Sequence, residues 1–253
     1  MIQDLHSHTY YSFCGEDAPS TIIEAAIAGG VELFGICDHC YGIAQQRPNI
    51  PLNSNRNEWS RDYQAAVDRY RDHMTLLKQK YSDRIKLAAG IEIPTIRKDY
   101  LTVPEELDLS KFDYCLIEHI DDSESVAKDI FDYAKRYGCK YKGIAHTDIP
   151  QMLENQGKDT YTFLKKMAEE NIFWEVNVNY DRIHSYREHQ YVKRIFYDEA
   201  LIKMIKESGV KMSVGFDGHR VDDYLPERVK MANNRLCALG IPLIFDEQDI
   251  ETT

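Results

Sequence analysis

The sequence predicts an α/β fold in which seven parallel strands close into a TIM-barrel-like (β/α) barrel. Seven short apolar runs alternate with helical segments, and this order is typical of parallel strands joined by right-handed crossovers. Six of the runs carry a possible metal ligand at or near their end, and a barrel brings its strand ends to one mouth. An open sheet would gather its site mainly at one switch point. Since no break in composition marks a linker, residues 1–253 are expected to form one domain.

The first half of the chain contains the clearest helix. The expected elements are a strand at 2–8, a helix at 19–30, a strand at 31–39, an irregular segment at 40–55, a helix at 56–81, a strand at 85–94 and a short helical turn at 103–107. The first helix opens at Pro19 and closes at Gly29-Gly30. Apolar residues from Tyr63 to Tyr81 recur in steps of four and three, which places them on one stripe of the helix at 56–81.

The second half repeats the same alternation. The expected elements are strands at 112–121, 139–149, 172–180 and 211–217, and helices at 124–137, 158–170, 198–208 and 226–239. Asn171, Gly209 and Gly240 close the last three of these helices. A polar loop is expected at 181–195. The apolar segment at 241–245 is either a last strand or a packing tail.

Charge and composition exclude several classes of function. The net charge of −11 repels nucleic acid phosphates over most of the surface, so a long nucleic acid is not expected as a partner. No stretch approaches the length of a transmembrane helix and no signal peptide is apparent, so we expect a cytoplasmic protein without membrane contact. Its six cysteines are then expected to be reduced. Cys37, Cys115 and Cys139 lie in strand-like runs and are expected in the core.

Side chains that can bind metal ions are concentrated on the strand ends. His6 and His8 have the spacing that puts both on one face of a strand, and Asp217 and His219 repeat it. The complete set has six imidazoles and two carboxylates: His6, His8, His39, Glu92, His119, His146, Asp217 and His219. These are too many for one tetrahedral ion. They predict a site for two or three divalent ions, with Glu92 able to bridge a pair.

These residues lie in motifs that resemble the PHP superfamily, named for the domain shared by bacterial polymerases and histidinol phosphatases. In the family's order the motifs are Asp4-Leu5-His6-Ser7-His8 with Ser12, Cys37-Asp38-His39, Gly90-Ile91-Glu92-Ile93-Pro94, His119, Ala145-His146-Thr147-Asp148 and Phe216-Asp217-Gly218-His219. The resemblance covers nearly the whole chain. It implies a distorted seven-stranded barrel with two or three divalent ions, Zn, Mn or Fe, at its mouth.

The resemblance also implies how the ligands are shared. The implied sets are His6, His8, Glu92 and Asp217 for one ion, Glu92, His119 and His146 for a second, and His39 and His219 for a third. Where three-metal members often supply a histidine to the third ion, this chain has Cys14, which is either a thiolate ligand or a bystander. Glu118 is another departure, because a small or apolar residue is common before the isolated histidine.

The expected reaction is hydrolysis of a small phosphorylated metabolite. The segments at 145–149 and 174–177 look most like the histidinol-phosphatase branch of the family, which hydrolyses a phosphomonoester. Clustered cations bind phosphate and lower the pKa of water, so the chemistry agrees with the ligand set.

Other roles follow from the position of single residues. The candidates for binding phosphate are Arg182, Arg187 and Arg220, although each is also compatible with an ordinary surface arginine. Asp148 and His184 are alternative candidates for protonating the leaving oxygen. Asp38 is expected to orient a ligand rather than to bind an ion.

Two other functions stay open at this point. Polymerase-linked members suggest a phosphodiesterase or exonuclease, but the charge of −11 and the lack of basic clusters speak against long nucleic acids. A metal-binding regulatory protein without turnover is the third hypothesis. Coordination shells without an open position for water would favour it.

Overall fold

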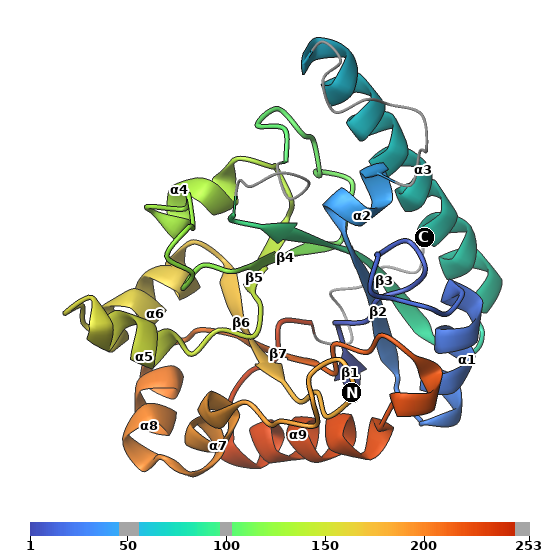
Figure 1. Ribbon diagram of the computed structural model, residues 1–253. Coiled ribbons are helices and arrows are strands. Elements are labelled where there is room, and N and C mark those ends of the chain that lie inside the picture. The colour runs from blue at the N-terminus through green and yellow to red at the C-terminus, as the bar shows by residue number, and fades with distance from the viewer. Residues whose placement is uncertain (46–55, 97–102, 246–253) are drawn as a thin grey trace.

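Seven parallel strands form a nearly closed barrel that helices surround (Figure 1). The structure is a computed structural model, and it describes residues 1–45, 56–96 and 103–245. The strands are β1 (Gln3–Asp4), β2 (Leu33–His39), β3 (Lys86–Pro94), β4 (Tyr114–Glu118), β5 (Tyr141–Ile144), β6 (Ile172–Asn177) and β7 (Met212–Gly215). They are hydrogen-bonded in sequence order, and each neighbouring pair is parallel. The predicted distorted barrel is therefore confirmed.

The distortion lies at the seam between β1 and β7. The seam is held by single backbone hydrogen bonds, from Leu5 N to Val214 O at 2.8 Å and from His8 N to Gly218 O at 2.7 Å. Asp217 N also donates to His6 O at 2.7 Å. The expected strand at 2–8 was therefore too long, because only Gln3–Asp4 pairs regularly.

The helices cover the outside of the barrel (Figure 1). They are α1 (Pro19–Ala28), α2 (Cys40–Gln45), α3 (Arg56–Tyr81), α4 (Ile130–Lys135), α5 (Ile149–Asn155), α6 (Thr160–Glu169), α7 (Gln190–Tyr197), α8 (Glu199–Ser208) and α9 (Pro226–Leu239), with a 3-10 turn η2 (Val221–Asp223). The helices expected at 56–81 and 226–239 have the expected bounds. No helix within the described ranges is long and apolar enough to span a membrane.

Several element predictions were wrong at positions where polar groups compete for the backbone. The strand expected at 139–149 ends at Ile144, and Asp148 instead caps α5 by accepting a hydrogen bond from Gln151 N at 3.1 Å. The helix expected at 124–137 is reduced to Ile130–Lys135, because Val126 N donates to Thr95 O at 2.9 Å and so pairs with another segment.

Three other differences concern segments between strands. The helical turn expected at 103–107 is a non-helical turn in the structure. The irregular segment expected at 40–55 begins with α2, and its residues 46–55 lie outside the described residues. The loop expected at 181–195 contains the start of α7, whose Tyr191, Ile195 and Phe196 are buried and hold this amphipathic helix against the barrel.

Residues on each strand alternate between the barrel interior and the helix layer. On β4, Cys115 and Ile117 pack in the outer core, whereas Tyr114 and Leu116 pack inside the barrel. We call the apolar interior cluster the floor; its buried members are Leu5, Leu33, Cys37, Ala88, Tyr114, Leu116, Ala145, Phe173, Ile244 and Phe245. The expected burial of Cys37, Cys115 and Cys139 is confirmed.

The segment at 241–245 is a packing tail that covers the floor. Met212 N donates to Pro242 O at 2.9 Å and Ile244 N donates to Met212 O at 2.8 Å, so the tail pairs only at the start of β7. The Phe245 ring lies edge-on to Tyr114 and Tyr141, with centroids 6.2 and 5.1 Å apart. The amino end of the barrel is thereby closed, and its carboxyl end carries the polar residues.

Candidate metal centre

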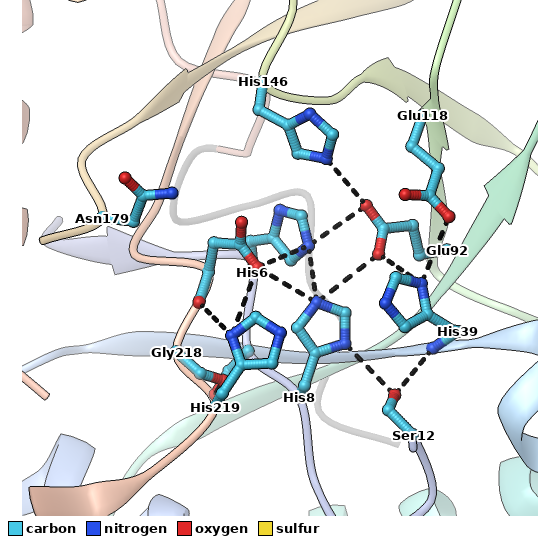
Figure 2. Close-up of polar contacts among 12 residues, drawn as sticks. His6, His8, Ser12, His39, Glu92, Glu118, His146, Asn179, Gly218 and His219 are labelled. Carbon is cyan, nitrogen blue, oxygen red and sulfur yellow. Dashed lines mark hydrogen bonds and ion pairs between the residues drawn. The ribbon is translucent and has the colours of Figure 1, made fainter. Parts of the chain in front are cut away.

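Polar side chains at or just after the ends of all seven strands converge at the carboxyl end of the barrel, which we call the mouth (Figure 2). Eight of the nine residues predicted as metal ligands lie in one cluster of close contacts or donor groups: His6, His8, Cys14, His39, Glu92, His146, Asp217 and His219. The ninth, His119, is at the edge of the cluster, where its Nε2 lies 2.9 Å from Glu118 Oε2. The alternation of β3 and β4 explains this convergence, because inward positions that are apolar near the floor become polar at the mouth.

Glu92 lies at the centre of the cluster (Figure 2). Its Oε1 is 3.3 Å from His6 Nε2 and 3.5 Å from His146 Nε2. Its Oε2 is 2.9 Å from His39 Nδ1 and 3.4 Å from His8 Nε2. Burial tends to raise the pKa of this carboxyl, but His6 and His39 outweigh it and hold the pKa well below its usual range. Glu92 is therefore an ionised carboxylate within reach of four imidazoles.

Asp217 occupies the opposite side of His8. Its Oδ1 is 3.1 Å from His8 Nε2 and 3.5 Å from His6 Nε2, and its Oδ2 is 3.2 Å from His184 Nε2. Burial works to raise the pKa of Asp217, yet the charge of His6 and the bond from His184 hold it well below its usual range. His6 Nε2 and His8 Nε2 are themselves 3.1 Å apart. His6 and His8 thus contact both Glu92 and Asp217.

Other groups of donors also lie close enough to share an ion. Their donor atoms all fall within 4.8 Å of one another in the groups His8, Cys14, His39 and His219; His6, His8 and Glu92; Asp181, His184 and His219; and His39, Glu92 and Glu118. The first group places Cys14 where the third ion was expected. His39 and His219 lower the pKa of the Cys14 thiol to about 7 against the opposing effect of burial, so a thiolate is accessible near neutral pH.

The donor atoms fit divalent cations because many lack other partners. Within the described part of the chain, His39 Nδ1, both oxygens of Glu92, Glu118 Oε1 and Asp181 Oδ2 are buried without a hydrogen bond. Buried polar atoms in proteins normally have a partner, and a water or an ion supplies it where no protein group does. Imidazoles and carboxylates are suitable ligands for Zn, Mn and Fe.

The backbone is strained where three of the predicted ligands lie. His119, His146 and Asp217 have φ values of 62°, 26° and 57°. Positive φ values of this kind are uncommon for residues other than glycine. Each follows the end of a strand. Strain of this kind persists where the surrounding structure fixes it and is common at functional sites.

Hydrogen bonds behind the donors hold the imidazoles in place. Glu175 Oε1 is 2.7 Å from His6 Nδ1, and Glu175 Oε2 accepts from His146 N at 2.8 Å. Asp38 accepts from Ser12 Oγ at 2.7 Å, and this hydroxyl lies 3.2 Å from His8 Nδ1. Such partners fix the ring orientation of a ligand histidine. The expected orienting position of Asp38 agrees with these contacts.

The two predicted proton donors have different surroundings. Asp148 caps α5 and lies 3.5 Å from Arg194 Nη1, so its contacts are structural. His184 reaches the cluster: its Nδ1 is 2.7 Å from Asp181 Oδ1, and its Nε2 lies beside Asp217. Burial tends to lower the pKa of His184, but Asp181 and Asp217 outweigh it and raise the pKa to about 9.

The three predicted arginines lie at the rim. Arg220 is paired with Glu16, and Arg182 Nε is 3.9 Å from Asp223 Oδ2. Arg187 is exposed. Arg182 and Arg187 lie in the loop that carries His184, and the contact of Arg182 with Asp223 is longer than that of Arg220 with Glu16.

Two donor residues and one positioning residue were not predicted from the sequence. Glu118 was noted only as a departure from the family pattern, Asp181 was not singled out, and Glu175 was named only within the segment at 174–177. Strand alternation was the signal for Glu118 and Glu175, since both occupy inward positions at strand ends. Asp181 lies in a loop after β6, where no periodicity applies.

Comparisons with known proteins agree with this geometry. The chain matches the PHP domain over residues 4–236. A comparison with curated proteins finds no match. Among solved structures, histidinol phosphate phosphatase from Lactococcus lactis subsp. lactis Il1403, complexed with Zn, L-histidinol and phosphate, has 17% identity and a TM-score of 0.57, with 95% of each chain covered.

Two further solved structures have weaker similarity. A putative histidinol phosphatase from Listeria monocytogenes has 15% identity and a TM-score of 0.46, covering 87% of this chain and 96% of its own. A chain of archaeal ribonuclease P with mature tRNA has 10% identity and a TM-score of 0.44, covering 96% and 99%. The seven-stranded barrel, the buried His, Glu and Asp clusters at its mouth and the match over residues 4–236 together show that the chain belongs to the PHP domain family.

Proposed function

We propose that this protein hydrolyses a small phosphomonoester with two or three divalent metal ions bound at the barrel mouth. The observation that carries the proposal is the charge of the mouth. Glu92, Glu118, Glu175, Asp181 and Asp217 are all buried, and among the described residues their ion pairs are with histidines only. Metal ions bind neutral imidazoles, so bound cations would replace the positive charge that protonated histidines supply to these carboxylates in the metal-free protein.

The proposed ligand sets are those that the resemblance implies. His6, His8, Glu92 and Asp217 would hold one ion, Glu92, His119 and His146 a second, and Cys14, His39 and His219 a third. Bound divalent cations supply charge neutralisation for a phosphate group and a lower pKa for a water molecule.

His184 is the best-placed proton donor. Its side chain is a quarter exposed, and its raised pKa of about 9 keeps it protonated at neutral pH. Asp181 holds the imidazole through Nδ1, which leaves Nε2 to face the mouth beside Asp217. These features favour His184 over Asp148, whose carboxylate is engaged at the start of α5.

Arginine at the rim would help to bind the substrate. A monoester dianion carries more charge than a diester, and a guanidinium can contact two of its oxygens. Arg182 and Arg187 lie in the same loop as His184 and are the favoured candidates. Arg182→Met or Arg187→Met should raise KM for the monoester by about 10-fold and leave metal content unchanged. Unaltered KM in both variants would place the phosphate contact elsewhere.

The similarity to the Lactococcus enzyme guides the choice of substrate. That enzyme's structure holds Zn, L-histidinol and phosphate. An identity of 17% supports the fold alone and does not identify the substrate of this protein. Histidinol phosphate is therefore tested first, as one member of a panel. Phosphorylated metabolites and phosphodiesters should be compared in the presence of Mn²⁺ or Zn²⁺.

We expect the protein to release phosphate from monoesters and to hydrolyse diesters at a lower rate. His184→Asn should lower kcat on substrates with poor leaving groups more than on nitrophenyl phosphate, whereas Asp148→Asn serves as the matched control. A preference for diesters would indicate the phosphodiesterase alternative. Metal-loaded protein without turnover on the whole panel would indicate a regulatory metal-binding protein.

A further inference from the structure

Glu118 is a buried carboxylate that none of the three ligand sets above uses. It is the last residue of β4 and points into the barrel, two positions after Leu116, which packs in the floor. Its exposed fraction is 3%. Figure 2 shows its carboxylate beside His39, on the side of the cluster where Glu92 also lies.

Two carboxylates therefore face the same imidazole nitrogen. Glu92 Oε2 is 2.9 Å and Glu118 Oε1 is 3.2 Å from His39 Nδ1. One nitrogen carries at most one proton, so it satisfies one carboxylate at best. Neither contact is directed as a hydrogen bond, since His39 Nδ1, both Glu92 oxygens and Glu118 Oε1 are all without a hydrogen-bond partner among the described residues. Donor atoms around a cation likewise lie close together without hydrogen bonds between them.

The charge at this point would be unbalanced once His39 and His119 are neutral. His119 Nε2 lies 2.9 Å from Glu118 Oε2 and occupies only the other oxygen of Glu118. Buried carboxylates are stable when they are paired or coordinate a metal ion. If His39 and His119 are neutral, as metal ligands must be, Glu92 and Glu118 have no counter-ion from the described side chains.

We propose that Glu118 is a metal ligand and that it forms, with His39 and Glu92, an oxygen-rich position for a hard divalent cation such as Mn²⁺. The inference rests on the proposed metal-dependent function and adds a position to it. The three donors lie within 4.8 Å of one another, and the two carboxylates are 2.9 and 3.2 Å from His39 Nδ1. Two ligands that each bind one ion at about 2.1 Å are at most about 4.2 Å apart, so these two separations fit a shared ion. Two carboxylates and one imidazole favour Mn²⁺ over softer ions.

This position competes with the thiolate-containing group of His8, Cys14, His39 and His219, because His39 belongs to both. The two groups differ in softness, since one holds a sulfur and the other two carboxylates. Removing Glu118 should leave His39 to the thiolate group, and removing Cys14 should leave it to the carboxylate group. The two variants should therefore shift metal preference in opposite directions.

The experiment measures metal binding by the full chain. Wild-type protein, Glu118→Gln and Cys14→Ser are freed of metal with a chelator and titrated with Mn²⁺ or Zn²⁺. Free Mn²⁺ is followed by electron paramagnetic resonance and bound Zn²⁺ by elemental analysis. Asp121→Asn is the matched control, because it removes one carboxylate charge from an exposed position three residues along the chain.

The expected result is that Glu118→Gln weakens one Mn²⁺ site by roughly 10- to 100-fold or more, whereas Zn²⁺ binding changes less. Cys14→Ser should show the reverse preference and lose the thiolate-to-metal absorption of the Co²⁺-loaded protein. Asp121→Asn should bind both ions as wild type does. Glu118→Leu is a second variant that avoids an unpaired buried amide, and it should lose the same Mn²⁺ site.

Unchanged Mn²⁺ affinity and stoichiometry in both Glu118 variants would overturn the proposal. In that case Glu92→Gln separates the two ideas: if it loses metal while the Glu118 variants do not, the metal-dependent function stands and the added position falls. If wild-type protein itself binds less than about one ion per chain, the proposed function falls as well.

Discussion

The floor and the mouth of the barrel are built by the same strands, yet they differ in how far they satisfy their own interactions. In the floor, apolar side chains fill the interior, and the one hydroxyl of Tyr114 donates to Leu5 O at 2.6 Å. Gly35 and Gly90 leave the space that the Tyr114 side chain occupies, since a Cβ at Gly35 would lie 2.2 Å from its hydroxyl oxygen and a Cβ at Gly90 would lie 2.3 Å from its ring. The floor is complete without any ligand.

The mouth lies two residues further along several strands. Its polar groups are not all satisfied by the described residues. Glu92 and Glu118 are buried with oxygens that lack hydrogen bonds among the described residues, and His146 and Asp217 have strained backbones. We therefore expect fold stability and metal binding to be separable in this barrel. Floor substitutions should alter unfolding, and mouth substitutions should alter metal binding and activity.

The largest effect is expected for Glu92→Ala, which tests the mouth. Loss of the carboxylate that the first two proposed ligand sets share should disturb two ions and lower kcat/KM by roughly 10⁴-fold, about 5 kcal/mol of transition-state stabilisation. His219→Ala should cost less, because its donor contributes only to the third set. Side-by-side kinetics with metal analysis decide the matter, and equal or reversed losses would remove the bridging role from Glu92.

Phe173→Ala tests the floor. Phe173 is fully buried in the floor cluster, so truncation should lower the free energy of unfolding by about 3–5 kcal/mol. Metal content per folded chain should stay as in wild type. Urea unfolding with and without Mn²⁺ measures the first quantity and elemental analysis the second. A loss of bound metal from the folded variant would show that the two regions are coupled.

The stability of the metal-free protein should fall as the pH rises from 6.5 to 9. Burial works to lower the pKa of His146, His184 and His219, but Glu92 for the first and Asp181 for the other two outweigh it and raise the values to about 9, 9 and 10. A raised histidine pKa adds stability that is complete below the unfolded value of 6.5 and is lost as pH passes the folded value. Cys14, with a lowered pKa of about 7, acts in the opposite direction but is one group against three.

Thermal unfolding across this pH range measures the effect, at about 2–4 °C in Tm for each kcal/mol. Metal binding requires neutral imidazoles, so adding Mn²⁺ or Zn²⁺ at pH 7.5 should release protons, which calorimetry in two buffers detects. A Tm that rises with pH in metal-free protein, or binding without proton release, would contradict these protonation states.

The smallest effect is expected for Tyr114→Phe. Its hydroxyl donates to Leu5 O inside the floor, and removing it leaves a buried carbonyl without that partner. The free energy of unfolding should fall by about 1–2 kcal/mol, while kcat/KM and metal affinity stay unchanged. A change in metal affinity would mean that a shift of the Leu5 backbone in the floor alters the position of the neighbouring His6.

The sequence was sufficient for the barrel and for most of the cluster because both depend on local patterns. Apolar runs with polar ends predicted the strands and the convergence of residues such as His39 and Glu92. Helix α3 could be bounded from its single apolar stripe. The short helix α7 was missed, because its few buried residues follow a polar loop and become helical through contact with the barrel.

Contacts between side chains from different segments could not be predicted from the sequence. Asp181 reaches His184 and His219 from a loop, and nothing in its neighbours' spacing predicts that contact. Glu118 follows the strand alternation, but its function depends on His39 lying between it and Glu92, which only the register of β2, β3 and β4 provides. The roles of Asp148 and His184 were equivalent in the sequence, and their different partners separate them.

The irregular seam between β1 and β7 has a consequence for folding order. The Asn233 side chain in α9 forms hydrogen bonds with both Gln3 N and Gln3 O, 230 residues earlier in the chain. Leu5 N likewise donates a hydrogen bond to Val214 O, far along the chain. A growing polypeptide must therefore keep one side of β1 unpaired until β7 and α9 have been synthesised. Contacts of such long sequence separation form late and slowly. Asp217 and His219 arrive with this last closure, so cations that need them are captured by an almost finished barrel and do not guide its first folding steps.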